Sequence, residues 1–296
     1  MVDLILAGSS SIMLAVDVAR RMGLNAIIPV VRKFPDGEIY VRITKAVEDK
    51  SVAVIHTLGG NPNDLLIEYL LVVKTLKDLG AKEVIAVIPY LAYARQDARF
   101  KEGEAVSARI IAELIESAGT SKVLTIDAHL HRIESIDKLF NIKALNVSAV
   151  PELAKYIAKN YSLRNPIVVG PDEESEQWAK VAAKVLNTDY IVLEKERLGD
   201  EEVIIESSVD IVKNRDVVIV DDIISTGGTM VETIHKLKEA NAGKILVSCI
   251  HPVLSANALN KILLAGAYDI VATDTIQSPV SKVTVSPVIA ENLPKL

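Results

Sequence analysis

Cysteine is almost absent from this sequence of 296 residues, and aromatic residues are scarce. The single cysteine, Cys249, excludes an intrachain disulfide and is typical of a chain kept in a reducing compartment. Aromatic residues make up 4% of the chain and hydrophobic residues 50%, so any core consists mostly of aliphatic side chains. Because β-branched aliphatic residues suit buried parallel strands, this composition favours an α/β fold over a disordered chain.

The sequence also has no excess of positive charge and no long hydrophobic run. Its formal net charge of −6 argues against general binding to nucleic acid. Its apolar runs are strand-sized and fall far short of the roughly 20 residues that span a bilayer. The N-terminus has no basic segment ahead of its first apolar run, which predicts that no secretory signal is present. We therefore expect a cytoplasmic protein that binds neither nucleic acid nor membrane.

Short apolar runs alternate with amphipathic stretches along nearly the whole chain. This alternation with short loops predicts parallel sheets flanked by helices. Two series of about five strands predict two domains, 1–147 and 148–296, divided within the weakly patterned region 141–151. We expect strands at 4–7, 26–31, 52–56, 84–88 and 123–126, then at 167–169, 190–193, 217–220, 244–250 and 270–272, with helices such as 64–79, 105–117, 174–186 and 229–240 between them.

The strongest local signal is the segment 217–229, in which a buried strand runs into two carboxylates and then into a Ser/Thr/Gly turn. Ligands of open α/β sheets bind at the carboxyl ends of the strands. The glycines allow close approach to an anion, and the N–H groups at the start of the next helix point at a phosphate. An ordinary capped helix is the alternative interpretation. The candidate sugar-phosphate contacts are Asp221, Asp222, Ser225, Thr226, Gly227, Gly228 and Thr229.

Two further segments carry groups that suit a purine nucleotide. In the turn 34–38 an exposed aromatic side chain can stack on a base and carboxylates can accept hydrogen bonds from it. Taken alone, this segment is more consistent with a solvated Pro-Asp-Gly turn. In the segment 89–97, which follows a strand, Arg95 offers a planar fork for phosphate and Gln96 offers an amide. An ordinary solvated loop is the alternative there.

Three more segments carry groups that suit metal or phosphate chemistry. His129 lies in the segment 127–131, which follows the expected strand 123–126. It is interpreted either as a ligand of a metal-bound triphosphate or as an ordinary loop histidine. Asp172 is either a Mg²⁺ ligand or the N-cap of the following helix. Lys195 and Arg197 alternate, so on an extended chain they face the same way. Composition alone favours a solvated hairpin, because acidic residues surround these two cations.

The segment 217–229 resembles the phosphoribosyl-diphosphate loop of type I phosphoribosyltransferase-fold proteins, which leaves transferase and synthase activities open. The other segments resemble those of ribose-phosphate pyrophosphokinases, namely F-x-D-G-E at 34–38, P-Y-x-R-Q-D within 89–97, D-x-H at 127–129 and K-x-R at 195–197. After the second and third of these segments the chain departs from the common family pattern, with Ala98-Arg99-Phe100 and Arg132-Ile133-Glu134. The resemblance implies two tandem type I phosphoribosyltransferase-like domains.

The resemblance also implies an activity, namely Mg²⁺-dependent transfer of the pyrophosphoryl group of ATP to O1 of ribose 5-phosphate. The products are then 5-phospho-α-D-ribose 1-diphosphate and AMP. A nucleobase phosphoribosyltransferase and a catalytically silent associated or regulatory subunit are the alternatives. The family assigns ATP binding to Phe34, Asp36, Gly37, Glu38, Arg95 and Gln96, metal binding to His129 and Asp172, catalysis to Lys195 and Arg197, and ribose 5-phosphate binding to Arg197 together with the residues of 221–229 named above.

The family resemblance finally implies self-association. Its F-x-D-G-E loop serves the ATP site of a neighbouring subunit, so we expect at least a homodimer. The expected small-molecule partners are ATP and ribose 5-phosphate, with Mg²⁺ as the cofactor.

Overall fold

The computed structural model describes residues 1–130, 132–193, 195–198, 201–204 and 209–296, and only the backbone in 195–198 and 201–204. The chain divides into two compact units. The N-terminal unit comprises Met1–Ser148, Thr275–Gln277 and Thr284–Leu296, and the C-terminal unit comprises Ala149–Asp274 and Ser278–Val283.

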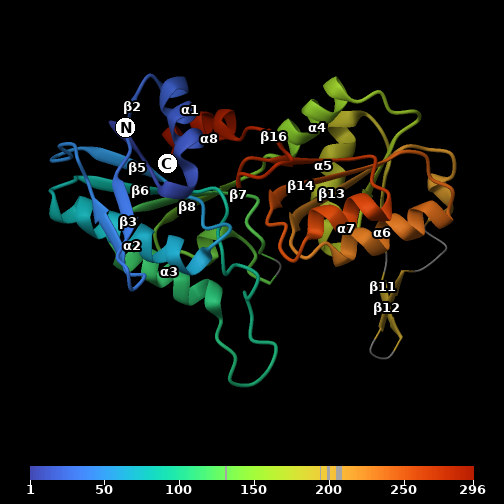
Figure 1. Ribbon diagram of the computed structural model, residues 1–296, viewed down its shortest axis with the longest axis horizontal. Helices are drawn as coiled ribbons and strands as arrows, with labels where there is room; N and C mark the ends of the chain where they lie inside the picture. The colour runs from blue at the N-terminus through green and yellow to red at the C-terminus, as the bar shows by residue number, and fades with distance from the viewer. Residues whose placement is uncertain (131, 194, 199–200, 205–208) are drawn as a thin grey trace. The chain divides into compact units, whose positions relative to one another are not determined.

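The N-terminal unit is built on a parallel six-stranded sheet with the order β2-β1-β5-β6-β7-β8. Helices α1 and α8 cover one face of the sheet, and α2 and α3 cover the other (Figure 1). The elements are β1 (Leu4–Ala7), β2 (Asn25–Ile27), β5 (Ser51–Ile55), β6 (Glu83–Ile88), β7 (Lys122–Ile126) and β8 (Lys143–Val147), with α1 (Ile12–Met22), α2 (Pro62–Asp78), α3 (Ser107–Ser117) and α8 (Ser286–Asn292).

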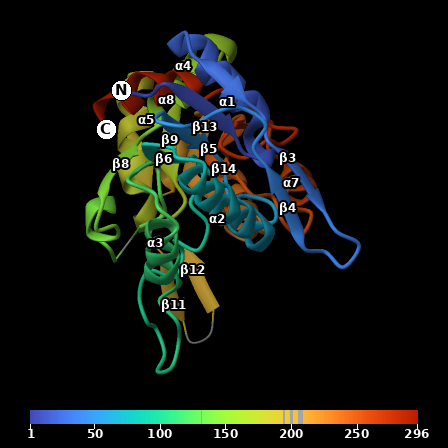
Figure 2. The same cartoon turned by 90° about the vertical axis from the view of Figure 1, so that its left-hand side faces the viewer.

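An antiparallel hairpin stands apart from this sheet. It consists of β3 (Val30–Lys33) and β4 (Ile39–Arg42), with Val30 opposite Arg42 and Lys33 opposite Ile39. Figure 2 shows the hairpin extending past the body of the unit beside α2. Lys33 and Asp64, at the first turn of α2, form an ion pair that fastens the hairpin to the helix.

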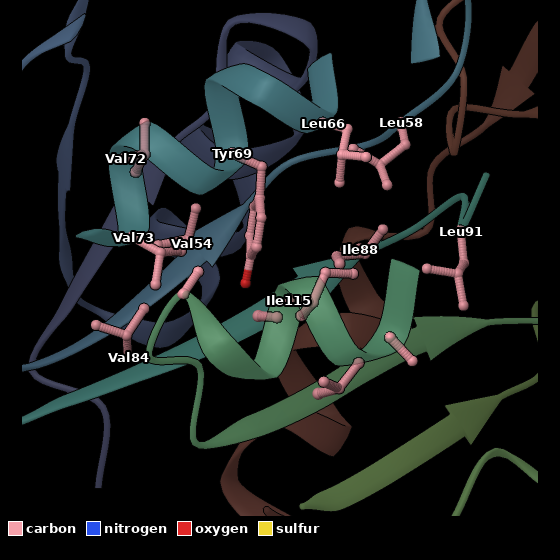
Figure 3. Close-up of a cluster of buried hydrophobic side chains, with 14 of the residues drawn as sticks. Val54, Leu58, Leu66, Tyr69, Val72, Val73, Val84, Ile88, Leu91 and Ile115 are labelled. Atoms are coloured by element: carbon pink, nitrogen blue, oxygen red, sulfur yellow. The ribbon is translucent and has the colours of Figure 1, made fainter. Parts of the chain in front are cut away.

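The core between α2, α3 and the sheet consists of aliphatic side chains, as the composition predicts. Among the residues that the structure describes, Tyr69 of α2 has the largest fully buried side chain, and Figure 3 shows it among aliphatic neighbours that include Ile115 of α3. Its hydroxyl shares a 2.7 Å hydrogen bond with the Thr120 hydroxyl, so the one polar atom of this ring is satisfied. Burial raises the pKa of the Tyr69 hydroxyl, which therefore stays protonated.

The C-terminal unit repeats the topology of the first, with a parallel sheet in the order β10-β9-β13-β14-β15-β16. Helices α4 and α5 cover one face and α6 and α7 the other (Figure 1). A separate antiparallel hairpin is formed by β11 and β12. The elements are β9 (Ile167–Gly170), β10 (Tyr190–Val192), β11 (Lys195–Leu198), β12 (Glu201–Ile204), β13 (Val217–Ile224), β14 (Ile245–Pro252), β15 (Asp269–Thr273) and β16 (Ser281–Val283), with α4 (Val150–Asn160), α5 (Glu176–Leu186), α6 (Gly228–Glu239) and α7 (Ala258–Ala265).

The predicted α/β class with two mostly parallel sheets is confirmed, but two local predictions differ from the structure. The expected strand 26–31 is two strands, β2 and β3, because Pro29 lies between them and has no N–H for a sheet. The weakly patterned region 141–151 contains β8, which is an edge strand and so needs less apolar character than the central strands. Among the helices of 1–130, 132–193 and 209–296, none combines the length and apolar character needed to cross a membrane.

The C-terminal end of the chain returns to the N-terminal unit, so this unit is not the continuous segment 1–147. Helix α8 packs on α1, where the Ser286 hydroxyl donates to Asp17 and accepts from Arg21 Nε at 2.8 Å. The side chain of Ile289 is fully buried there. The expected C-terminal domain 148–296 therefore differs from the C-terminal unit, because pairing of a late helix with an early one leaves no local trace in the sequence.

Candidate active site

Two adjacent carboxylates, Asp221 and Asp222, lie in the second half of strand β13. A third carboxylate, Asp172, follows the neighbouring strand β9. The Asp222 N–H donates to Asp221 Oδ1 at 2.9 Å, and the Asp222 side chain is 3% exposed. Because β9 and β13 are neighbouring parallel strands, Asp172 emerges at the same sheet edge. Burial raises the pKa of Asp221 well above its usual range, and the negative charges of Asp222 and Asp172 add to this rise.

The carboxylates of Asp172, Asp221 and Asp222 thus concentrate negative charge at this edge. In the part of the chain that the structure describes, no three His, Cys, Asp or Glu side chains form a ready-made metal cluster. The donors at this edge are carboxylate oxygens, which suit Mg²⁺, and Mg²⁺ sites commonly use one or two carboxylates together with water and substrate oxygens. The acidic edge therefore fits a Mg²⁺ that arrives with a phosphorylated substrate.

Asp172 also serves as a helix cap, which was its alternative interpretation. Its Oδ1 accepts from the Ser175 N–H at 3.2 Å, and its own N–H donates to the Ser175 hydroxyl at 3.3 Å. This capping box starts the short 3₁₀ helix Glu173–Ser175 that leads into α5. Capping holds the Asp172 carboxylate at the sheet edge.

The turn after β13 begins helix α6 without a side-chain cap. Gly227 is the N-cap residue with φ of 79°, a left-handed conformation that favours glycine, and a Cβ there would lie 3.1 Å from Ala258 Cβ. At Gly228 a Cβ would meet nothing closer than 3.9 Å, so the space in front of this residue is open. The N–H groups of the first helical turn thus face an open, uncapped corner, which is the arrangement that binds a phosphate.

A loop that the sequence analysis did not single out supports this turn. Leu254 donates its N–H to the carbonyl of Ile224 at 2.9 Å, and the Ser255 and Ser225 hydroxyls are 3.4 Å apart. Leu254, Ala256 and Asn257 all have positive φ, between 49° and 62°. Such strained backbone is uncommon for non-glycine residues and occurs often at binding sites. Only Asn257 has a side chain that favours this conformation, so the sequence carries little signal for the loop.

Cys249 lies directly beside the carboxylates, and no sequence pattern predicted this position. It is paired with Asp221 across β13 and β14, and its side chain is fully buried. Burial raises the pKa of this thiol, and the charge of Asp221 raises it further. Cys249 is therefore a protonated thiol that packs behind the acidic edge rather than a reactive thiolate.

In the N-terminal unit, other side chains follow the strand at the corresponding place in the sheet order. His56 and Thr57 come directly after β5, which is third in its sheet as β13 is in the other. The buried Glu68 carboxylate accepts from the Ser9 N–H at 2.8 Å beside them. A carboxylate of the protein itself thus takes donors at the start of this unit's first helical segment, which disfavours a bound phosphate there.

The predicted catalytic cations belong to the β11–β12 hairpin. Along the backbone, Lys195 and Arg197 are opposite Ile204 and Glu202. Their side chains, and the neighbouring residues 194 and 199–200, lie outside what the structure describes.

The predicted adenine-binding turn is a compact, exposed loop at the tip of the β3–β4 hairpin. Phe34 and Glu38 close it through a 2.8 Å backbone hydrogen bond, Gly37 has φ of 98°, and Asp36 Oδ1 accepts from the Glu38 N–H at 3.2 Å. Asp36 thus stabilises the turn itself, as the simpler interpretation holds. Phe34 keeps 39% of its surface exposed, which leaves ring area for stacking.

The structure adds two residues to this turn that sequence reasoning missed. The Arg32 guanidinium carbon lies 4.9 Å from the Phe34 ring centroid and 4.5 Å from the Tyr40 ring centroid. The Phe34 and Tyr40 rings meet edge to face at 6.0 Å. This arrangement fixes the orientation of the Phe34 ring through cation–π contacts. The alternation of Arg32, Phe34 and Tyr40 across a hairpin is the signal that could have revealed it.

The loop after β6 presents Arg95 to solvent and holds Gln96 partly buried. The Gln96 amide group donates to the carbonyl of Ala98 at 3.1 Å and to Glu104 Oε2 at 3.1 Å. Because both acceptors are oxygens, the amide nitrogen must face them, and the side-chain oxygen of Gln96 remains to accept a hydrogen bond. His129 is partly buried in the loop after β7, where Asn146 Oδ1 accepts from the Ala128 N–H at 3.0 Å.

Comparison with known proteins identifies the family. Residues 4–119 match the model described as the N-terminal domain of ribose phosphate pyrophosphokinase, and residues 135–280 match a phosphoribosyl transferase domain. The ribose-phosphate pyrophosphokinase of Methanopyrus kandleri is 38% identical over 293 residues, covering 99% of both chains. The chain belongs to the ribose-phosphate pyrophosphokinase family.

Further relatives agree with this assignment. The ribose-phosphate pyrophosphokinase of Methanothermobacter thermautotrophicus is 40% identical, covering 97% of this chain and 99% of its own. The crystal structure of phosphoribosylpyrophosphate synthetase from Mycobacterium smegmatis matches with a TM-score of 0.87 and 27% identity, covering 99% of this chain and 98% of that one. The protein is therefore an enzyme of the ribose-phosphate pyrophosphokinase type, a transferase of nucleotide biosynthesis, and the predicted fold of two phosphoribosyltransferase-type domains is confirmed.

Within this family member, the structure groups the predicted residues by unit. The C-terminal unit brings Asp172, Asp221, Asp222 and the 225–229 turn to one sheet edge. The N-terminal unit carries the 34–38 turn, the Arg95–Gln96 loop and His129 on three separate loops. The assigned functions of these residues stay predictions.

Proposed function

We propose that this enzyme transfers the pyrophosphoryl group of ATP to O1 of ribose 5-phosphate. The anomeric hydroxyl attacks the β-phosphorus in line, the bond from that phosphorus to the α–β bridging oxygen breaks, and the hydroxyl proton is released. The products are 5-phospho-α-D-ribose 1-diphosphate and AMP. The observation that carries this proposal is the uncapped Gly227–Gly228 corner directly after paired carboxylates, in a chain related over its full length to ribose-phosphate pyrophosphokinases.

The C-terminal unit supplies the acceptor site. The N–H groups of the 225–229 turn and the hydroxyls of Ser225, Thr226 and Thr229 hold the 5-phosphate, because the corner at Gly228 is open and the helix start is uncapped. Asp221 and Asp222 accept hydrogen bonds from the ribose hydroxyls. Neutral hydroxyl donors suit these carboxylates better than a second anion does, because the pKa of Asp221 is already raised by neighbouring charge.

The donor nucleotide is bound by residues of the N-terminal unit. The Phe34 ring stacks on the adenine, Arg95 binds phosphate, and Gln96 accepts a hydrogen bond through the oxygen that Glu104 and Ala98 leave available. Lys195 and Arg197 neutralise charge on the transferring group, and Arg197 also contacts ribose 5-phosphate. Positioning and charge neutralisation therefore account for most of the catalysis.

Mg²⁺ is the proposed cofactor, and it supplies charge neutralisation for the triphosphate when bound. Asp172 would hold Mg²⁺ through its carboxylate at the acidic edge of the C-terminal unit. His129 is the proposed imidazole ligand of a Mg²⁺ site in the N-terminal unit. The donors at the acidic edge fit a hard cation, because they are oxygen atoms at a site where carboxylates repel one another.

The enzyme is also proposed to work as a homo-oligomer of at least two chains. The 34–38 turn is exposed at the tip of a hairpin that extends past its own unit, which supports a role in the ATP site of a second copy (Figure 2).

The proposal is tested by incubating the protein with ribose 5-phosphate and Mg²⁺–ATP. AMP should appear in step with the consumption of ribose 5-phosphate, and neither product should form when one substrate or Mg²⁺ is left out. Failure to release AMP would contradict the proposal. Consumption of phosphoribosyl diphosphate with a free nucleobase, in the absence of ATP, would instead indicate a nucleobase phosphoribosyltransferase. Binding of phosphoribosyl diphosphate without any turnover would indicate a silent or regulatory subunit.

A further inference from the structure

Two loops of the N-terminal unit leave neighbouring strands at the same sheet edge. The first follows β6 and carries Arg95 and Gln96, and the second follows β7 and carries His129. Phe100 follows the motif of the first loop, and Arg132 follows the motif of the second loop. The structure places these two residues in contact with each other.

Arg132 connects the loops through its backbone and its side chain. Its N–H donates to Asp97 Oδ2 at 2.7 Å, and its Nη1 lies 3.9 Å from Asp97 Oδ1. Its guanidinium carbon lies 4.7 Å from the Phe100 ring centroid, within the range of a cation–π contact. Asp97 is only 5% exposed, so its carboxylate depends on nearby donors to offset the cost of burial.

The contacts of Arg132 lie directly beside the proposed binding residues. Asp97 follows Gln96 in the chain, and the second loop is held before His129 by the Ala128–Asn146 hydrogen bond and after it by Arg132. In the first loop, Glu104 Oε2 accepts from Gln96 Nε2 and from the Phe100 N–H at 3.0 Å. The Glu104 carboxylate thus holds both Phe100, which lies under the Arg132 guanidinium, and Gln96, which is proposed to bind ATP.

We propose that Arg132 is a positioning residue that couples the nucleotide-binding loop to the His129 loop. Its guanidinium holds Phe100 and Asp97 in place, and its backbone fixes the segment that carries His129. The residues proposed to contact the nucleotide are thereby held in a fixed position relative to the His129 imidazole. This inference rests on the proposed function, because it assigns Arg132 an effect on ATP and metal binding.

The side chain and the backbone of Arg132 make separable contributions. Substitution leaves the N–H to Asp97 in place and removes the stacking on Phe100 and the charge beside Asp97. Arg132→Lys keeps the charge and removes the planar stacking group. The side chain is 48% exposed, so neither substitution opens a cavity in the core.

Binding is measured first, with α,β-methylene-ATP and Mn²⁺ as probes in isothermal titration calorimetry. Arg132→Ala is expected to weaken binding of the analogue about tenfold and Arg132→Lys about threefold, in the range of coupling between contacting residues. Lys138→Ala removes an exposed cation further along the same segment and should bind as the wild type does. Equal losses in Arg132→Ala and Lys138→Ala would show a general charge effect and overturn the proposal.

Steady-state kinetics then separate positioning from simple loss of stability. The KM for ATP and the Mg²⁺ concentration for half-maximal rate should both rise in Arg132→Ala, whereas the KM for ribose 5-phosphate should stay unchanged. A double-mutant cycle with Phe100→Ala should be non-additive, and Phe100→Leu should resemble Phe100→Ala because leucine lacks a ring face. Strict additivity, or an equal rise in the KM for ribose 5-phosphate, would overturn the coupling. If the wild type releases AMP and these variants match it, the inference fails while the proposed function stands.

Discussion

Gly227 and Gly228 stand next to each other, yet the fold needs them for different reasons. Gly227 has a left-handed φ and lies close to Ala258, whereas Gly228 begins α6 with open space before it. Gly227→Ala should destabilise the C-terminal unit by about 1–2 kcal/mol through backbone strain. Gly228→Ala should leave stability within about 0.5 kcal/mol and raise the KM for ribose 5-phosphate at least tenfold by obstructing the phosphate. Thermal melts and kinetics on both variants check this, and a normal KM in Gly228→Ala would remove this corner from the binding site.

The raised pKa of Asp221 lowers the stability of the ligand-free protein at neutral pH, and the proposed binding of ribose by this carboxylate explains why the residue is there. Because its folded pKa is raised above the ordinary 3.8, the folded state binds more protons than the unfolded state between these two values. Stability of the ligand-free protein therefore falls as pH rises through this window, and the loss persists at pH 7.

Asp221→Asn should remove this cost, because asparagine has no charge to place beside Asp222 and Asp172. The thermal midpoint at pH 7 should rise by a few degrees, as for other removals of unfavourable charge of about 1 kcal/mol. Affinity for ribose 5-phosphate should fall at least tenfold in calorimetry. A variant that melts lower and binds normally would contradict both assignments.

Lys195 should affect the chemical step more than binding. Lys195→Ala is expected to lower kcat by about 100-fold or more, in the range of lost electrostatic stabilisation of a transition state, with less than threefold change in the affinity for ribose 5-phosphate. Glu196→Gln is the matched control, because it changes the residue between the two cations and leaves both cations in place. Unchanged turnover in Lys195→Ala would exclude this residue from the mechanism.

At the scale of elements, α8 is held to the N-terminal unit by a charge network on α1. The Ser286 hydroxyl and the Arg21 and Arg20 guanidiniums lower the pKa of Asp17 to about 2 from its usual 3.8. Stability from this group is present above pH 3.8 and is lost as the pH falls through about 2. Allowing for solvent screening at the exposed Arg20, the contribution is roughly 1–2 kcal/mol.

Ser286→Ala should therefore lower the stability of the N-terminal unit at pH 7. Between pH 4 and pH 2 the stability of this variant should fall less than that of the wild type. Acid titration of unfolding, followed by circular dichroism, measures both effects. Ser117→Ala at the exposed end of α3 is the control, and it should follow the wild-type curve. A Ser286→Ala profile that parallels the wild type would mean that the hydroxyl does not lower the pKa of Asp17.

Elements also show where sequence periodicity is informative. The central strands β5, β6, β13 and β14 are buried apolar runs, and each was expected within a few residues of its observed bounds. Edge strand β8 was missed because half-buried strands carry less apolar signal.

At the scale of the whole molecule, the proposed sharing of the 34–38 turn requires association. Sedimentation velocity, with and without inorganic phosphate, should show a species of at least two chains. Substitution of Phe34 by Ala should raise the KM for ATP, and mixing it with Lys195→Ala should restore part of the activity if each variant supplies the residue that the other lacks. A monomer with full turnover would contradict the shared site.

The sequence by itself determined the α/β class, the two-unit organisation and the order of the chemical motifs, because apolar periodicity and turn residues act over a few neighbouring positions. Only the tertiary structure decided which distant residues meet. The pairing of Arg132 with Phe100, the position of Cys249 behind Asp221 and the return of α8 to α1 all depend on side-chain contacts across strands and loops. Such contacts form when remote surfaces pack, and no local pattern of residues specifies them.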